Sequence, residues 1–236
     1  MKAMILAAGR GERMRPLTDT CPKPLLRAGG KPLAVWHLEG LAKAGIREVV
    51  INHAHLGQML EDALGDGSHW GLRISYSPEQ EALETAGGIA QALDQLGPDA
   101  FLVVNGDVYC EMDFASVQAN AGVTMLSSDI LAHIVLVDNP EHHGRGDFHL
   151  DGSLVRPDRE PRLTFSGVGV YRKELFEKIL PGTPAKLGPL LAAAAARELV
   201  SAERFTGYWL DVGTPERLER LDARLTEPSS GTRPEQ

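Results

Sequence analysis

The residues best suited to chemistry lie near the start of the chain. A glycine-rich turn, Gly9-Arg10-Gly11, follows the apolar run Met4–Ala8, and Lys23 stands between two prolines further along. Small residues expose backbone N–H groups to phosphate oxygens, arginine adds bidentate contacts, and lysine adds a point charge. Arg13 and Arg15 bring more positive charge to the same stretch. These residues predict a polyphosphate site at the end of a first β-strand.

Two aspartates at the ends of predicted strands could hold a divalent cation. Asp107 follows the apolar segment 100–105, and Asp211 follows the β-rich segment 203–210. Magnesium takes one or two protein carboxylates and completes its shell with water and phosphate oxygens. Asp107 could instead cap a turn and Asp211 a helix, although Thr214 is already placed to cap the helix that follows. From the residues alone, both interpretations remain open.

The elements that must position these residues alternate between strand and helix. Apolar or β-rich patterns predict strands at 2–8, 47–53, 72–77 and 100–105, and helical patterns separate them at 32–44, 56–64 and 85–96. This order predicts an α/β fold with a doubly wound, mostly parallel sheet. Ligands in such sheets bind beyond the carboxyl ends of the strands. The glycine-rich turn and Asp107 should therefore face one crevice.

The second half of the chain is less regular. It predicts strands at 131–137, 148–150, 162–171 and 203–210, and helices at 173–180, at 189–199 and from Thr214 onward. Residues 227–236 are polar and contain two prolines, so we expect a disordered tail there.

Composition narrows the class of protein. The 236 residues are 43% hydrophobic and 24% charged, which suits one large globular domain or one domain with a small lobe. The net charge of -8 argues against a nucleic-acid partner. Two cysteines, no signal peptide and no apolar run of membrane-spanning length favour a cytoplasmic protein with no membrane partner.

The N-terminal stretch resembles the L-A-A-G-x-G-x-R-M-x-P-L-T…P-K-P-L signature of the sugar-1-phosphate nucleotidyltransferase family, and the likeness extends from Lys2 to about Leu218. A dinucleotide fingerprint fits less well, because Met14 stands where it needs glycine. The resemblance implies a Rossmann-like core with a small sugar-binding lobe. It implies one domain over 1–226, with a nucleotide-binding half of about 1–110 and a sugar-binding half of about 111–226.

The resemblance also implies roles for individual residues. Arg15 and Lys23 would be catalytic, and Asp107 and Asp211 would bind Mg²⁺. The segment 79–89 is similar to the family's base-binding segment, in which Thr85 would cap a helix, Glu79 would accept the imide N–H of uracil, and Glu84 replaces the usual glycine. The residues implied to bind nucleotide are Ala7, Ala8, Gly9, Arg10, Gly11, Glu79, Glu84, Thr85, Gly88 and Asn105.

The loop at 137–148 is similar to the family's sugar-side loop, so Asn139 and Gly146 would contact the sugar, with Ser166 and Gly167 on a crossing strand. His142-His143 are interpreted as loop histidines, because adjacent residues of an extended chain point apart. The family's Glu-Lys-Pro element is absent. Arg156 or Arg159 could replace its lysine, or Lys23 could bind the sugar phosphate.

The resulting expectation is an enzyme that joins an NTP, with UTP preferred, to a sugar 1-phosphate and releases pyrophosphate. The absence of a β-helix extension favours a monomer. Within the family, the short form without a β-helix and the strand at 161–167 imply a muramyl sugar phosphate as the acceptor, with mannose 1-phosphate and glucose 1-phosphate as alternatives. The sequence itself does not fix the sugar. Outside enzymes, the alternative is a non-catalytic sensor of nucleotide sugars.

Overall fold

A mixed β-sheet forms the centre of the structure, a computed structural model that describes residues 1–126 and 129–227. Its nine strands lie in the order β5-β4-β1-β6-β11-β8-β12-β10-β9. β11 and β10 run antiparallel to both of their neighbours, and the other neighbouring strands are parallel. The expected mostly parallel sheet is therefore confirmed. The strands are β1 (Ala3–Leu6), β4 (Glu48–His53), β5 (Arg73–Pro78), β6 (Phe101–Asn105), β8 (Ala132–Val137), β9 (His149–Asp151), β10 (Leu154–Arg156), β11 (Thr164–Tyr171) and β12 (Val200–Arg204).

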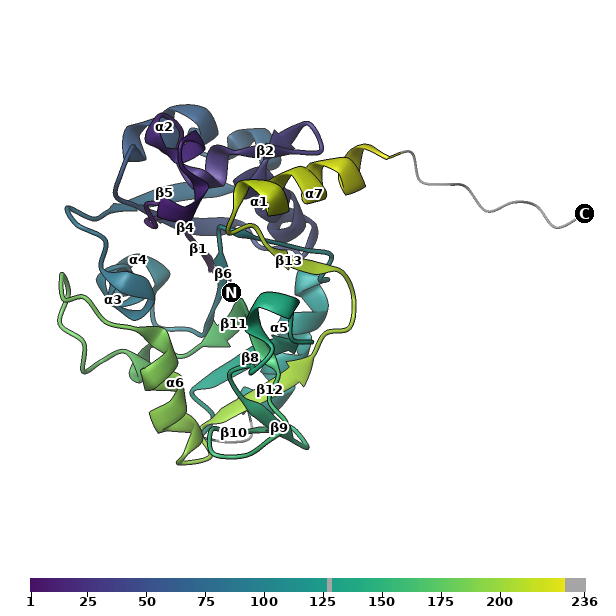
Figure 1. Ribbon diagram of the computed structural model, residues 1–236. Coiled ribbons are helices and arrows are strands. Elements are labelled where there is room, and N and C mark those ends of the chain that lie inside the picture. Colours follow the sequence, from purple (N-terminus) through teal and green to yellow (C-terminus); the bar gives the residue numbers. More distant parts are fainter. Residues whose placement is uncertain (127–128, 228–236) are drawn as a thin grey trace, which may run out of the picture.

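Helices cover both faces of this sheet (Figure 1). On one face, apolar side chains of α1, α2 and α5 pack against the strands, with Leu38, Leu60 and Val117 among them. On the other face, α3, α4 and α6 contribute residues such as Ile89 and Leu191. The doubly wound α/β class is therefore confirmed. The helices are α1 (Leu33–Lys43), α2 (Gly57–Leu64), α3 (Glu84–Gln91), α4 (Leu93–Leu96), α5 (Phe114–Leu126), α6 (Leu187–Ala195) and α7 (Pro215–Thr226).

The uninterrupted apolar character of β1 follows from its position. Met4 packs into the core on the α3 and α6 side, and its neighbour Ile5 packs into the core on the α1 side. Successive strand residues point to opposite faces, so a strand covered on both faces is apolar throughout. β1 lies between β4 and β6, with Ile5 level with Ile51 and Val104. The glycine-rich turn thus emerges from the middle of the parallel half of the sheet.

The C-terminal segment returns to the N-terminal half of the molecule. β13 (Trp209–Asp211) pairs antiparallel with β7 (Val108–Cys110), which places Asp211 level with Val108. α7 then packs against β2 (Arg27–Ala28), which forms a short hairpin with β3 (Lys31–Pro32) (Figure 1). Leu218 and Leu221 of α7 share an apolar cluster with Leu33 of α1. Thr214 caps α7 as predicted, because its hydroxyl accepts a hydrogen bond from the Arg217 backbone N–H at 3.4 Å. This return brings two distant aspartates to the same place.

Two predicted elements in the second half are wrong. The strand expected at 203–210 is two strands, because β12 pairs with β8 in the main sheet whereas β13 pairs with β7 in a separate sheet. The chain must leave one sheet to reach the other. The helix expected at 173–180 is a single turn at Lys173–Leu175, followed by turns as far as Gly182. The buried Phe176 follows that turn directly.

Other differences concern elements that the sequence pattern did not reveal. The helix expected at 85–96 is divided into α3 and α4 at Ala92, and α5, β2, β3, β7 and β10 were not predicted. The start of α5 does carry a signal, because Asp113 accepts hydrogen bonds from the Ala115 backbone and the Ser116 hydroxyl. The predicted disordered tail lies outside the described residues from residue 228 onward. Within residues 1–126 and 129–227, no helix is long and apolar enough to cross a membrane.

Candidate active site

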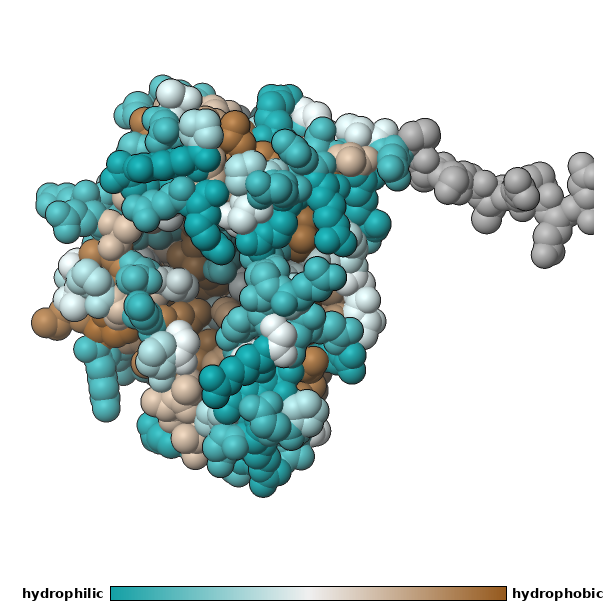
Figure 2. All heavy atoms as spheres, in the orientation of Figure 1, coloured by the Kyte–Doolittle hydropathy of each residue, from teal (hydrophilic) through white to brown (hydrophobic). Residues whose placement is uncertain are grey.

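A cavity of about 640 Å³ lies at the carboxyl ends of β1, β4 and β6. Figure 2 shows a hollow near the middle of one face of the molecule, with hydrophobic residues on its floor and hydrophilic residues around its rim. Parallel strands open a crevice at this edge of a sheet, so the location matches the sequence-based expectation. The predicted residues that line it are Ala7, Ala8, Gly9, Gly11, Lys23, Glu79, Glu84, Thr85, Asn105 and Asp107.

A second cavity of about 380 Å³ adjoins the first. The two share Arg13, Asn105 and Asp107 in their linings, so a molecule in one can reach a molecule in the other. Of the predicted sugar-binding residues, Ser166 and Gly167 line this second cavity. Its lining also includes Asp211 and residues that the sequence did not single out for a ligand: Pro140, His142, His143, Thr164, Phe165 and Trp209.

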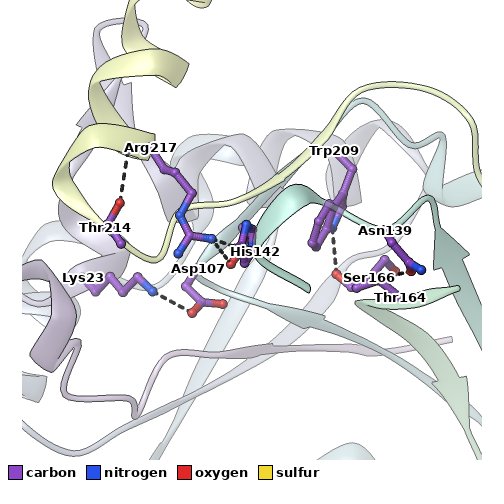
Figure 3. A network of polar contacts seen from close by, with 10 residues as sticks. Lys23, Asp107, Asn139, His142, Thr164, Ser166, Trp209, Thr214 and Arg217 are labelled. Atoms are coloured by element: carbon purple, nitrogen blue, oxygen red, sulfur yellow. Dashed lines mark hydrogen bonds and ion pairs between the residues drawn. The ribbon is translucent and has the colours of Figure 1, made fainter. Parts of the chain in front are cut away.

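Lys23 is buried in the wall of the first cavity, and a short turn carries it. It begins the 3₁₀ helix η3 (Lys23–Leu25), and its Nζ donates to Asp107 Oδ2 at 2.7 Å (Figure 3). The Lys23 side chain is 8% exposed, whereas that of Asp107 is 42% exposed. A buried ammonium needs such a partner, because an unpaired buried charge is costly. The pair presents both a cation and a carboxylate to the first cavity.

Gly11 allows the glycine-rich turn to lie against Lys23. Its backbone has φ of +67°, and a Cβ atom there would lie 2.9 Å from Thr18 Cγ2 and 3.4 Å from Lys23 Cβ. Thr18 also donates its hydroxyl to the Gly11 carbonyl at 2.8 Å. A larger residue would strain the backbone and push the turn away from the lysine. Both the backbone conformation and the close packing against Thr18 and Lys23 therefore require glycine at position 11.

Asp211 is the second carboxylate of the site and is held from α7. Arg217 Nη1 donates to Asp211 Oδ2 and lies 2.8 Å from His142 Nε2 (Figure 3). Arginine has no acceptor, so Nε2 of His142 must accept that hydrogen bond and cannot also donate to Asp211 Oδ1, 3.1 Å away. Among the described residues, Oδ1 is accordingly buried without a hydrogen bond.

The two aspartates fit a magnesium site. The Val212 backbone N–H donates to the Asp107 carbonyl at 2.8 Å, which joins the two acidic segments. Asp107 and Asp211 both line the second cavity. Their donor set is oxygen only, as Mg²⁺ prefers, and the Asp211 Oδ1 atom is free to accept a cation. The described residues contain no cluster of three or more His, Cys, Asp or Glu that could hold a metal, so two carboxylates are what this site offers.

The arginines of the N-terminal loop occupy different places. Arg13 lines both cavities. Its guanidinium lies close to Gly213, because a Cβ atom built on that glycine would be 3.1 Å from Arg13 Nη2. Arg15, the predicted catalytic residue, forms an ion pair with Asp19 at 3.2 Å and lines neither cavity. Arg10 also lies outside both linings. Arg13 is the arginine of the G-x-R-M part of the family signature, and this match could have identified it as the arginine that lines the cavities.

The base segment is held by a buried polar network that includes Asn52, a residue the sequence did not reveal. Asn52 Oδ1 accepts from the Ala7 N–H at 2.9 Å, and its Nδ2 donates to Glu79 Oε1 at 2.6 Å. Glu79 Oε2 accepts from the Leu83 N–H at 2.8 Å. A Cβ atom on Gly88 would lie 2.6 Å from Glu79 Oε1, so Gly88 leaves room for this network rather than lining a cavity. Both Glu79 oxygens thus accept hydrogen bonds within the protein, and its role toward uracil stays a prediction.

The start of α3 differs from the predicted cap. The helix begins at Glu84, its N-cap residue is Leu83, and no side chain caps it, so the expectation that Thr85 caps the helix is wrong. Glu84 has φ of +59°, a left-handed conformation that glycine adopts more easily. The backbone therefore keeps this conformation although glutamate replaces glycine.

Asn139 and Gly146 hold the sugar-side loop in place but do not line the second cavity. Asn139 accepts from the Thr164 hydroxyl at 2.8 Å (Figure 3) and donates to the Arg162 carbonyl at 2.9 Å. Gly146 has φ of +64°, and a Cβ atom there would lie 2.8 Å from that same carbonyl. A direct contact of these two residues with a sugar stays a prediction.

Arg156 and Arg159, suggested as replacements for the family's lysine, point elsewhere. Arg156 pairs with Asp151 and Glu198, and Arg159 pairs with Asp151 at 2.9 Å. Neither arginine lines a cavity. Lys23, the remaining candidate from the sequence, does line the first cavity.

A buried histidine supports β7, the strand that begins directly after Asp107. His37 of α1 is 2% exposed, and its Nε2 lies 2.8 Å from the Val108 carbonyl. Burial lowers the pKa of His37 to about 4, although the Val108 carbonyl and the Asp107 charge act in the opposite direction. At neutral pH the ring is uncharged and donates from Nε2, because a carbonyl can only accept. This bond fixes β7 to α1 beside the acidic site.

Comparisons with known proteins agree on one family. The family model described as nucleotidyl transferase matches residues 2–227. The chain is 57% identical to the N-acetylmuramate alpha-1-phosphate uridylyltransferase of Neisseria meningitidis serogroup B, over 94% of this chain and 97% of that protein. It is 31% identical to the mannose-1-phosphate guanyltransferase of Schizosaccharomyces pombe, over 91% of this chain and 61% of that protein. The crystal structure of a putative glucose-1-phosphate thymidylyltransferase from Bacillus anthracis has the same fold, with a TM-score of 0.83, 22% identity and coverage of 98% of both chains.

Proposed function

The chain belongs to the nucleotidyl transferase family, and on this basis we propose that it converts UTP and N-acetylmuramate 1-phosphate into UDP-N-acetylmuramate and pyrophosphate. It is a sugar-1-phosphate nucleotidyltransferase. The observation that carries the choice of UTP and of the muramyl sugar is the 57% identity to an enzyme of that name, over nearly the full length of both proteins. A role in the recycling of peptidoglycan follows from that substrate.

The arrangement of the two cavities supports this reaction. The larger cavity carries the glycine-rich turn, Lys23 and the base segment, so we assign it to the nucleotide. The smaller cavity carries Ser166, Gly167 and Trp209, so we assign it to the sugar. Arg13 and Asp107 lie in both linings, where the α-phosphate and the sugar phosphate must meet. An oxygen of the sugar phosphate then attacks the α-phosphorus, and the bond to the departing pyrophosphate breaks in line.

No protein nucleophile is needed for this step, so the residues contribute position and charge. Lys23 and Arg13 stabilise negative charge that develops on the phosphates, and the backbone N–H groups of the glycine-rich turn bind phosphate oxygens. Members of this family generally use Mg²⁺. Asp107 and Asp211 would hold that ion, which when bound neutralises phosphate charge.

Pyrophosphate release measured across the four NTPs and a set of sugar 1-phosphates tests the proposal. We expect the highest kcat/KM for UTP with N-acetylmuramate 1-phosphate, and loss of activity on chelation with recovery on adding Mg²⁺. Highest activity with GTP and mannose 1-phosphate, or with glucose 1-phosphate, would replace this assignment by the corresponding relative. Binding of nucleotide sugars with no pyrophosphate release from any pair would favour a sensor instead.

A further inference from the structure

We propose that His143 recognises a carboxylate on the sugar substrate and thereby selects an acidic sugar over its neutral counterpart. This inference rests on the proposed function, because N-acetylmuramate is N-acetylglucosamine with a lactyl ether that ends in a carboxylate. The second cavity must accept that negative charge although two aspartates, Asp107 and Asp211, already line it. Leaving the added carboxylate without a cation beside these acids would be costly.

Three basic side chains line the second cavity, namely Arg13, His142 and His143. Arg13 also lines the nucleotide cavity, where phosphate charge competes for its guanidinium. His142 accepts a hydrogen bond from Arg217 and lies 3.1 Å from Asp211, so it is engaged on the metal side of the cavity. His143 is the remaining basic residue of this lining, and it does not line the larger cavity assigned to the nucleotide.

The surroundings of His143 leave one ring nitrogen for a ligand. Its Nε2 lies 3.0 Å from Asp147 Oδ1, and Asp147 Oδ2 accepts from the Phe165 backbone N–H at 2.8 Å. The chain of contacts therefore ties the histidine to β11, on the wall of the cavity that Phe165 also lines. Among residues 1–126 and 129–227, Nδ1 of His143 has no hydrogen-bond partner. The side chain is 41% exposed, so a ligand can approach it.

This arrangement suits a second carboxylate. An imidazole that binds a carboxylate at each nitrogen donates from both, so it carries both protons and a positive charge. The contact with Asp147 fixes the orientation of the ring. Nδ1–H would then donate a charge-assisted hydrogen bond to the substrate carboxylate. Asp147 acts through the histidine and is a positioning residue.

Other basic residues near the lobe do not fit this role. Arg162 pairs with Glu160 at 3.2 Å, and Arg156 and Arg159 both pair with Asp151. None of these three arginines lines the cavity. Arg145 lies two positions after His143 on the same loop and is exposed, but it is also outside the lining. Arg145 therefore offers a matched control with the same sign of charge.

The test compares kcat/KM for N-acetylmuramate 1-phosphate, its carboxylate methyl ester and N-acetylglucosamine 1-phosphate, each with UTP. His143→Gln should lower the ratio of the first substrate to the third by about 10- to 100-fold, as expected for a lost hydrogen bond to a charged group. The variant should change the ratio of methyl ester to N-acetylglucosamine 1-phosphate much less. Asp147→Asn should lower the first ratio in the same direction but by a smaller factor. Arg145→Gln should leave it within about twofold of the wild type.

The outcomes separate this inference from the proposed function. A wild type that does not favour N-acetylmuramate 1-phosphate over N-acetylglucosamine 1-phosphate would remove the proposed substrate itself. A wild type that does favour it, together with a His143→Gln variant that keeps the wild-type ratio, overturns only the role of His143. Equal losses for all three substrates in His143→Gln, or a loss of selectivity in Arg145→Gln, would also overturn it.

Discussion

Lys23 and Lys31 show how two lysines in similar ion pairs can differ in function. Lys23 contacts Asp107 at 2.7 Å in the wall of the larger cavity. Lys31 contacts Glu39 at 2.6 Å and lies over the Trp36 ring, outside both cavities. Each ammonium is paired with one carboxylate, but of these two lysines only Lys23 lines a cavity that a phosphate could enter. The role of a charged residue thus depends on what can reach it.

Replacing these two lysines should therefore have unequal effects. Lys23→Ala should lower kcat by about 100- to 1,000-fold, because charge stabilisation aimed at the transition state acts on the chemical step. Lys31→Ala should keep kcat within about twofold of the wild type, as expected for an exposed surface pair. Steady-state pyrophosphate release at saturating substrates measures both. Similar losses of kcat in the two variants would contradict the assignment of Lys23.

At the scale of single elements, α3 combines a buried polar anchor with a strained first residue. Its amino-terminal turn is anchored by Glu79, which accepts the Leu83 N–H. The helix then begins at Glu84, whose φ is +59°. Such backbone strain persists where surrounding contacts hold the conformation, and it is often found at ligand sites. Glu84 lines the nucleotide cavity, so the strained turn belongs to the site.

The strain at Glu84 predicts an order of stability among variants. Glu84→Gly and Glu84→Ala both remove the carboxylate, but only glycine adopts the left-handed conformation without steric cost. Glu84→Gly should be about 1 kcal/mol more stable than Glu84→Ala in its free energy of unfolding, since alanine keeps that cost. Urea unfolding at neutral pH measures the difference. If Glu84→Ala proves equally stable or more stable, α3 does not begin in the strained conformation.

At the scale of the whole molecule, the site is assembled from both ends of the described chain. The β7–β13 pairing places Asp211 beside the segment that carries Asp107, and α7 supplies Arg217. The Gly29 N–H donates to Asp222 of α7 at 2.8 Å, which ties that helix to the N-terminal half. His37 supports the same region from α1 through the Val108 carbonyl. Loss of global stability should therefore also loosen the acidic site.

His37 makes this stability depend on pH. Its pKa is lowered from 6.5 to about 4 in the folded protein. Between pH 6.5 and pH 4, His37 is therefore protonated in the unfolded chain more readily than in the folded protein. Acid then favours unfolding, and this residue should reduce the free energy of unfolding by roughly 3 kcal/mol as pH falls from 6.5 to 4. His37→Gln keeps a donor for Val108 but does not titrate, so its stability should fall less over this range. Urea titrations at several pH values test this, and parallel losses in both proteins would argue against it.

Local patterns were enough to predict the parallel strands β1, β4, β5 and β6 and the helices α1 and α2 between them, but not the short strands β2, β3 and β7 or the helix α5. The apolar runs that became β1 and β6 are buried on both faces, and such burial leaves a mark in the sequence whatever the neighbours are. The Thr214-Pro215 start of α7 was predictable for a similar reason, because capping depends on a few adjacent residues. The segment from residue 203 to 210 misled the prediction, since both of its parts favour strand but pair in different sheets.

The chemistry of the site was readable in the sequence, as glycine, lysine and aspartate at predicted strand ends, but its geometry was not. Three arginines follow one another in the N-terminal loop, and only folding directs Arg13 into both cavities while Arg15 pairs with Asp19. Likewise, adjacent histidines gain different partners, Arg217 for His142 and Asp147 for His143. Residue type and spacing are local properties, whereas the direction of a side chain depends on backbone angles and on packing against residues far away in the sequence.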